Sequence, residues 1–203
     1  MGKTPPQIPK SEELSKKRKR NIEIRSREYL STDEIGQLRK AARGSGRHGN
    51  RDDALVLVMF RHALRVGEAV ALRWEQVDLN QGLLHVKRLK NGIPSTHPIR
   101  SKELRVLRKL QRIYPRNPYV FVSERKAPLT VRAVQLIVSR AGKLAGLPFP
   151  IHPHMLRHST GFYLANKGHD TRAIQSYMGH ANIKNTVIYT ELSPQRFNDF
   201  WDD

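Results

Sequence analysis

The 203-residue sequence contains no cysteine, so it can form neither a disulfide framework nor a zinc site with cysteine ligands. It also lacks a long apolar run. The stretch ALVLVMF at residues 54–60 is far too short to span a bilayer, and the amino terminus has no apolar segment of the signal-peptide kind. These absences predict a soluble, cytoplasmic protein without a membrane partner.

Acidic residues are also scarce. The chain has 18 Asp and Glu against 37 Lys and Arg, a formal net charge of +19 and a sequence pI near 10.7. Such an excess of positive charge attracts polyanions, and nucleic acid is the usual one. The alternative, a basic protein whose charge serves only solubility, stays open at this point. The length fits one domain or at most two.

The composition divides the chain into three parts. Residues 1–28 are rich in Pro, Lys and Glu, and their KKRKR run at 16–20 repels itself, so we expect a basic, disordered tail. A linker and a phosphate-binding arm are both compatible with this segment. Residues 29–191 contain the periodic apolar patterns of a folded domain, and residues 192–203 form a carboxyl-terminal tail.

The apolar patterns predict a mixed α/β domain that is mainly helical, with a small sheet. A helix begins at STDEIGQLRKAA, where Ser31 and Glu34 form a capping box. A buried helix follows at DDALVLVMFRHAL. We expect short strands at GLLHVKRL, IPSTHPI and YVFVS, and further helices near residues 101–113, 130–145, 153–167, 171–178, 182–190 and 194–201.

The stretch HPHMLRH, residues 152–158, is the most informative motif. On a helix that starts near Pro153, the side chains of His154, Arg157 and His158 share one face of the first turn. Two histidines four residues apart can bind zinc, but an arginine between them repels a dication. Structural histidines are a second alternative. An anion site at a helix start is the third, since the helix dipole and free N–H groups favour negative charge there.

Other residues along the chain could serve an anion site, although each has an ordinary explanation. Arg65 is followed by Glu68, as in a helix ion pair. Lys90 lies at the tip of the expected hairpin, where lysines are usually only solvated. His180 follows Gly179 and precedes Tyr189 by nine residues, and a tyrosine there would ordinarily pack in a core.

The order of these residues resembles the catalytic set of the tyrosine recombinase (phage integrase) family. The resemblance extends over about residues 29–191 and depends on PHMLRH, MGH and a tyrosine nine residues later. Within the family, the short length and the phrases RLKNG and IHPHMLRH are similar to the Fim-type DNA invertases. The resemblance implies a site-specific recombinase that cuts and rejoins double-stranded DNA through a covalent phosphotyrosine. It also implies no cofactor, no metal, a homotetramer on paired sites and a place near the nucleoid. The implied catalytic residues are Arg65, Lys90, His154, Arg157, His180 and Tyr189.

The chemistry of this reaction suits these residue types. Two guanidiniums, Arg65 and Arg157, can bind the nonbridging phosphate oxygens bidentately, and His180 can add a hydrogen bond. Lys90 would protonate the leaving 5′ oxygen, with Lys87 and Arg88 as competitors for that role. A free phenol has a pKa near 10, so we expect positive charge and acid–base help from His154 to activate Tyr189.

Several features depart from the family pattern or leave the function open. Residues 1–28 cannot form the separate amino-terminal DNA-clamping domain that most family members carry. Contacts to DNA are predicted for exposed basic residues, with a solvated basic face as the alternative: Arg43, Arg47, Lys87, Arg88, Arg132, Arg140 and Lys143. Two other functions remain: relaxation of DNA as in type IB topoisomerases, and a non-catalytic DNA-binding regulator. The aromatic stripe Phe197, Phe200 and Trp201 would pack on its own domain or on a neighbouring subunit.

Overall fold

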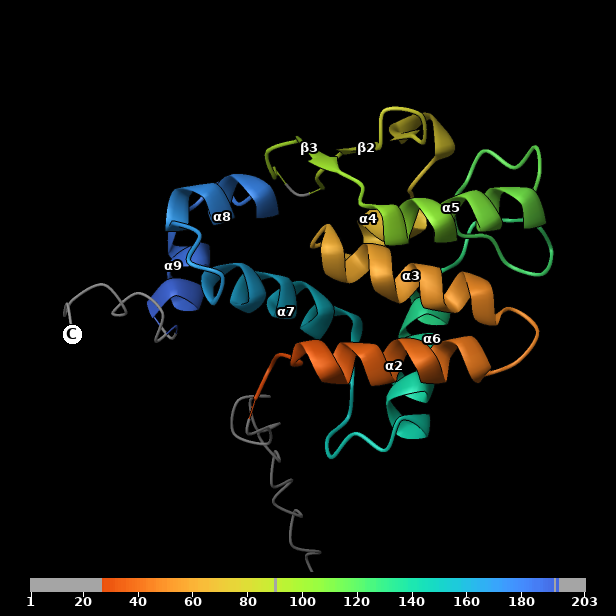
Figure 1. Cartoon of the computed structure of the whole chain (residues 1–203), viewed down its shortest axis with the longest axis horizontal. Helices are drawn as coiled ribbons and strands as arrows, with labels where there is room; N and C mark the ends of the chain where they lie inside the picture. Colours follow the sequence, from red (N-terminus) through yellow and green to blue (C-terminus); the bar gives the residue numbers. More distant parts are fainter. Residues whose placement is uncertain (1–26, 90, 192, 194–203) are drawn as a thin grey trace, which may run out of the picture.

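The computed structural model describes residues 27–89, 91–191 and 193. These residues form a mainly helical structure with a small sheet at one edge, which confirms the predicted mixed, mainly helical fold (Figure 1). The elements in chain order are α2 (Thr32–Gly44), α3 (Gly49–Arg61), α4 (Val66–Val70), the 3-10 helix η1 (Trp74–Gln76), β1 (Val77–Asp78), β2 (Leu83–Val86), β3 (Ser95–Pro98), α5 (Ser101–Ile113), α6 (Val131–Leu144), α7 (Pro153–Ala165), α8 (Thr171–Met178) and α9 (Lys184–Glu191).

Helix α2 begins where the capping signal predicted. The Ser31 side chain accepts a hydrogen bond from the Glu34 amide, and the Glu34 carboxylate accepts one from the Ser31 amide. Its buried face is formed by Ile35, Leu38 and Ala42. The glycine-rich stretch after α2 ends the helix, and the chain returns as α3.

Helix α3 is the centre of the core. Its residues from Arg51 to Phe60 are all buried, and it packs against α2, α5 and α7. Figure 1 shows α3 between α5 and α2, with α6 crossing near α2. From Ala54 to Phe60 the helix is apolar around its whole circumference and must be covered on every side, and these neighbours supply that cover.

The sheet is antiparallel in the order β1-β2-β3, and Leu84 faces His97 across the β2–β3 pair. Strands β2 and β3 form the predicted hairpin, and α5 follows over the predicted residues, burying Leu107 and Leu110. The prediction of a strand at YVFVS is wrong: Tyr119 and Val122 form only isolated bridges. This segment is fully buried at Val120–Val122 but pairs with two different short partners, so no continuous ladder develops.

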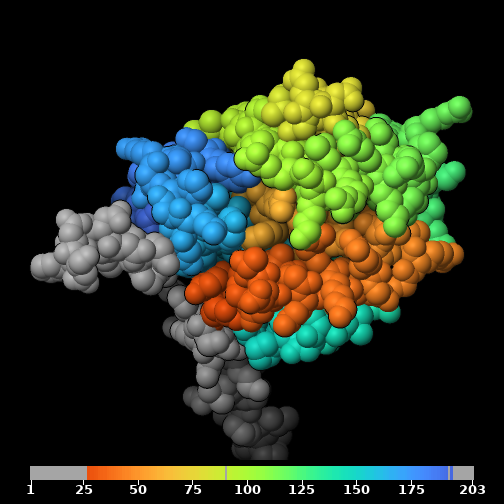
Figure 2. Space-filling model, viewed as in Figure 1, coloured from red at the N-terminus to blue at the C-terminus, as the bar shows by residue number. Residues whose placement is uncertain are grey.

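The carboxyl-terminal part consists of α7, α8 and α9, which pack on one another. The face in Figure 2 is hollowed where α2, α3, α5 and the blue carboxyl-terminal helices meet. The hollow is a pocket of about 390 Å³ whose lining includes Thr32, Arg61, Glu103 and Tyr163. None of the described helices is long and apolar enough to cross a membrane.

Candidate active site

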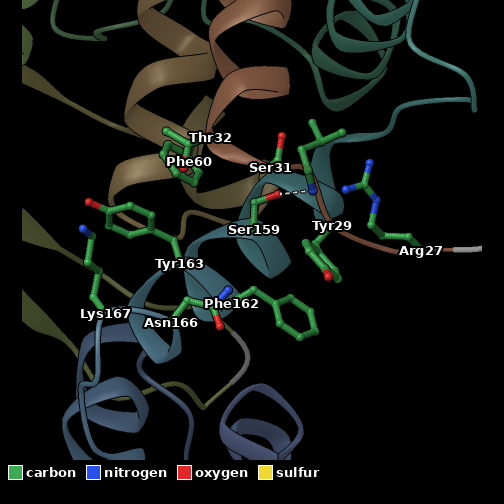
Figure 3. A pocket seen from close by; sticks show the side chains of 11 residues that line it. Arg27, Tyr29, Ser31, Thr32, Phe60, Ser159, Phe162, Tyr163, Asn166 and Lys167 are labelled. Carbon is green, nitrogen blue, oxygen red and sulfur yellow. Dashed lines mark hydrogen bonds between the residues drawn. The ribbon is translucent and has the colours of Figure 1, made fainter. Parts of the chain in front are cut away.

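Helix α7 carries two different faces, and the predicted site occupies one of them. Four residues spaced i, i+3, i+4 and i+7 form that face: His154, Arg157, His158 and Gly161. The opposite face lines a separate pocket of about 360 Å³ near the first described residues, with Ser159, Phe162 and Tyr163 on α7 and Asn166 just after it (Figure 3). There the Leu30 amide donates a hydrogen bond to Ser159 Oγ at 2.8 Å. This pocket thus lies on a different face of α7 from His154, Arg157 and His158.

Arg157 is almost completely buried, with 2% of its surface exposed. Its Nη1 donates to the Ala63 carbonyl, and its Nη2 donates to the Met178 carbonyl at 2.7 Å. Burial, followed by the charges of Arg65 and Arg88, lowers the pKa of Arg157 to about 9. The guanidinium is therefore charged at neutral pH and held between α3 and the end of α8.

Arg65 stands immediately before α4 and is the more accessible of the two guanidiniums. Its Nη1 donates to Glu68 Oε1 at 2.8 Å, and its amide donates to Glu68 Oε2 at 2.9 Å. Burial alone would raise the pKa of Glu68, but the hydrogen bonds from Arg65 and the charge of Arg88 lower it overall. Glu68 is thus an ionised residue that orients Arg65, the structural role expected from the sequence.

His180 follows the left-handed Gly179 at the end of α8 and is buried. Its Nδ1 lies 2.8 Å from Thr186 Oγ1, which fixes the ring. Burial and the charges of Arg157 and Arg65 lower the pKa of His180 to about 4, so the imidazole is neutral at pH 7. A neutral imidazole can still donate one hydrogen bond to a phosphate oxygen.

Tyr189 lies on α9 with only 2% of its surface exposed. Its ring packs directly on Gly161, where an added Cβ would come within 2.7 Å of the ring carbons. We expected positive charge to lower its pKa, but burial dominates over Arg157 and Arg65 and raises the pKa of Tyr189 to about 12. In this conformation the phenol is protonated and buried.

The hydroxyl of Tyr189 lies 3.0 Å from Nδ1 of His158. His154, to which the acid–base role was assigned, contacts the His158 ring edge-on at a centroid distance of 4.5 Å. Burial is the largest of the effects that lower the pKa of His158, so its ring is neutral at pH 7 and can accept the phenolic proton. The catalytic set implied by the sequence did not include His158. Its position on the face shared with His154 and Arg157 was the signal available.

The predicted basic residues divide into exposed and buried ones. Six are exposed: Arg43, Arg47, Lys87, Arg132, Arg140 and Lys143. Arg88, which was expected on the surface, has a side chain that is 0% exposed. Lys90 lies outside the described residues, as does the tail from residue 194. Among the described residues, no group of His, Asp and Glu could hold a metal ion.

Solved structures identify the class of this fold. XerA recombinase superposes with a TM-score of 0.75 at 28% identity, over 86% of this chain and 65% of that chain. XerH site-specific recombinase, bound to a palindromic difH substrate, superposes with a TM-score of 0.71 at 23% identity, over 83% of this chain and 51% of that chain. The structure therefore has the fold of a tyrosine recombinase catalytic domain.

Sequence comparison gives the family. Residues 28–196 match the Phage integrase family, and the chain belongs to that family. Type 1 fimbriae regulatory protein FimB of Escherichia coli (strain K12) is 41% identical over 189 residues, which cover 91% of this chain and 94% of FimB. Tyrosine recombinase XerC of Pseudomonas syringae pv. tomato is 35% identical over 177 residues, 85% of this chain and 58% of XerC. The predicted likeness to the Fim proteins is confirmed, and the chain is a DNA strand transferase of the site-specific tyrosine recombinase type.

Proposed function

We propose that Tyr189 attacks a DNA phosphodiester. The phenolic oxygen bonds to phosphorus, the bond to the 5′ oxygen breaks, and a 3′-phosphotyrosine and a free 5′ hydroxyl result. Attack by a 5′ hydroxyl of the partner strand reverses these steps. The phosphotyrosine retains the energy of the phosphodiester, so neither ATP nor a metal is required.

The observation that carries this proposal is the charge around one phenol. Arg157 and Arg65 both act electrostatically on Tyr189 and on His180. We infer that the two guanidiniums and His180 bind the nonbridging oxygens, where negative charge increases in the transition state. Glu68 is the carboxylate that balances this cluster, and its hydrogen bonds to Arg65 keep that guanidinium in place.

Proton transfer needs an acceptor for the phenolic proton and a donor for the leaving oxygen. The hydrogen bond between Tyr189 and His158 supports His158 as the first acceptor. The exposed His154 beside it would exchange the proton with the DNA side of the site. Lys90 is proposed as the general acid because of its place, between Arg65 and His154, in the order of residues that resembles the family's catalytic set.

DNA contacts are proposed for the exposed basic residues given above. Helix α6 carries three of them, Arg132, Arg140 and Lys143, on its exposed side. The XerH complex and a lambda integrase dimer are solved structures of this fold with DNA. We propose double-stranded DNA as the substrate, a homotetramer on paired sites, and residence at the nucleoid. The outcome of exchange is inversion, excision or integration.

The nucleophile is tested by Tyr189→Phe. This variant should bind DNA normally and form no covalent adduct with it, as measured by protease-sensitive retardation of labelled DNA. Adducts formed by the Phe variant would identify another nucleophile. Sequencing of the DNA trapped on the unaltered protein would give the target site.

The guanidinium of Arg157 is tested by Arg157→Lys. An ammonium cannot reproduce the two-pronged contact, so the cleavage rate should fall by about 10²–10³-fold with DNA affinity retained.

Relaxation of plasmids without a recombination site would favour the topoisomerase alternative. Deletion of residues 194–203 tests the tail: loss of paired-site assembly alone indicates docking between subunits, whereas unfolding indicates packing on its own domain.

A further inference from the structure

Arg88 is two residues before Lys90 and has an unusual position for a surface hairpin. It follows β2, and its side chain turns inward until none of it is exposed. An arginine loses much of its hydration there, and such a cost is offset only by close partners. The partners show what the residue connects.

The guanidinium of Arg88 joins three segments. Nη1 donates to the Ala63 carbonyl at 3.1 Å and to Glu68 Oε2 at 3.0 Å. Nη2 donates to the His62 carbonyl at 3.2 Å and to the Tyr177 carbonyl at 2.7 Å. The end of α3, the start of α4 and the end of α8 are therefore fixed to the hairpin that carries Lys90.

The start of α4 and the end of α8 lead directly to two proposed catalytic residues, Arg65 and His180. Ala63 is two residues before Arg65, and its carbonyl accepts hydrogen bonds from both Arg88 and Arg157. Ala63 has a φ of 50°, a left-handed conformation that costs energy for alanine. The guanidiniums of Arg88 and Arg157 thus hold the carbonyl of this strained residue, two positions before Arg65.

The chain on both sides of Lys90 is fixed as well. Before it, the Leu89 amide donates to Glu68 Oε1 at 3.2 Å. After it, the Ile93 amide donates to the Gly179 carbonyl at 3.3 Å. Gly179 has a φ of 65°, and a Cβ there would lie 2.7 Å from Arg88 Cγ. The hairpin and the residue before His180 thus pack directly on the stem of Arg88.

We propose that Arg88 is a positioning residue, which fixes the chain on both sides of Lys90 to the segments that lead to Arg65 and His180. The inference rests on the proposed function, because it assumes Lys90 as the general acid. Arg88 does not touch DNA, and it acts through the residues that it places. Its loss should therefore impair protonation of the 5′ oxygen more than attack by Tyr189.

The test compares two DNA substrates at the cleaved bond. A 5′-bridging phosphorothiolate releases a thiolate, which leaves without a proton because a thiol is far more acidic than an alcohol. Arg88→Gln should lower the adduct rate on ordinary DNA by about 100-fold, the effect of a misplacement of about 1 Å, and on the phosphorothiolate by less than about tenfold. Lys90→Ala should show the same pattern, and the double variant should be no slower than Lys90→Ala.

Arg51→Gln is the matched control, because Arg51 is also buried and bonds to Asp52 and to the Val122 carbonyl, away from the site. Any loss that it causes should be equal on the two substrates. An equal loss for Arg88→Gln on both substrates, or no loss, overturns the proposal. If Arg88→Gln does not fold, Arg88→Lys is measured instead, and failure of both to fold makes Arg88 a stability residue only. Failure of the proposed function would look different: adducts in Tyr189→Phe, or Lys90→Ala without rescue by the phosphorothiolate.

Discussion

The main hydrophobic core and the smaller buried cluster around Tyr189 support different proposed catalytic residues. The main core joins buried residues of α2, α3, α5, α6, α7 and the sheet. The smaller cluster has five buried members, and the proposed nucleophile is one of them: Ala63, Ala165, Ile174, Met178 and Tyr189. Arg157 extends from a helix anchored in the main core, whereas Tyr189 depends on the smaller cluster. Arg157, which is proposed to bind phosphate, thus lies on a helix of the main core, and the proposed nucleophile does not.

This difference has a physical consequence for catalysis. Tyr189 is buried with a raised pKa, so the proposed attack requires its hydroxyl to become accessible to a phosphate. Segments with few buried apolar contacts open at lower free energy than the core. Helix α9 buries only Thr186 and Tyr189. We therefore expect α9 to rearrange when DNA binds, while α7 keeps Arg157 in place.

The largest expected effect breaks the main core. Leu55 is fully buried in α3, and Leu55→Ala should lower the free energy of unfolding by about 2–5 kcal/mol in urea. Ile174→Ala makes a similar cavity in the smaller cluster. It should speed hydrogen exchange in α9 and leave the amides of α3 protected. Equal acceleration of α3 and α9 in the Ile174 variant would show that the two clusters open as one unit.

A smaller effect targets the contact between α7 and Tyr189. Gly161→Ala places a methyl group 2.7 Å from the Tyr189 ring, an overpacking worth about 1–3 kcal/mol. We expect α9 to shift and covalent adduct formation to fall, with DNA affinity unchanged. Gly36→Ala on the exposed side of α2 is the control, because its added Cβ meets nothing within 4 Å. The control should be stabilised by up to about 1 kcal/mol. Normal adduct formation by Gly161→Ala would refute the contact.

Local patterns in the sequence predicted most of the fold. The capping box at Ser31 and Glu34 and the helix over residues 101–113 depend on neighbours in the chain, and both formed as expected. Helix α4 was missed, since five residues are too few to show a period. The motif order also brought Arg65, Arg157, His180 and Tyr189 to one place in the structure.

Long-range geometry was not available from the sequence. No local pattern shows that Arg88 turns inward, because its partners lie 20 to 89 residues away. The partner of the Tyr189 hydroxyl depends on how α9 crosses α7, which decides between His154 and His158. The pKa of Tyr189 was misjudged for the same reason: charge can be counted in a sequence, but burial cannot.

The pH dependence of stability gives a finer comparison. The pKa of His180 is about 4 in the folded protein against an ordinary value of 6.5, so the unfolded chain takes up the proton first as pH falls. The free energy of unfolding that the buried, neutral His180 contributes is fully present above pH 6.5 and is lost as the pH falls toward 4. Between pH 7.5 and 5.5 the loss should be about 1.4 kcal/mol. His180→Gln should lose less stability over this range by that amount, as measured by urea unfolding. The same pH dependence in both proteins would mean that the histidine is not shielded.

The smallest expected effect is that of removing metal ions. The groups proposed to stabilise the transition state are the two guanidiniums of Arg65 and Arg157 and the neutral imidazole of His180, which are held by hydrogen bonds to Glu68, to backbone carbonyls and to Thr186. A dication among them would be repelled by both guanidiniums, and Glu68 already accepts hydrogen bonds from Arg65 and Arg88. Adduct formation in excess EDTA should therefore equal that in untreated protein at matched ionic strength. Salt must be matched because DNA binding by a chain of net charge +19 weakens as ionic strength rises. Loss of adducts in EDTA with recovery on adding zinc would make the histidines of α7 metal ligands, and the phosphate-binding role of Arg157 would then have to be abandoned.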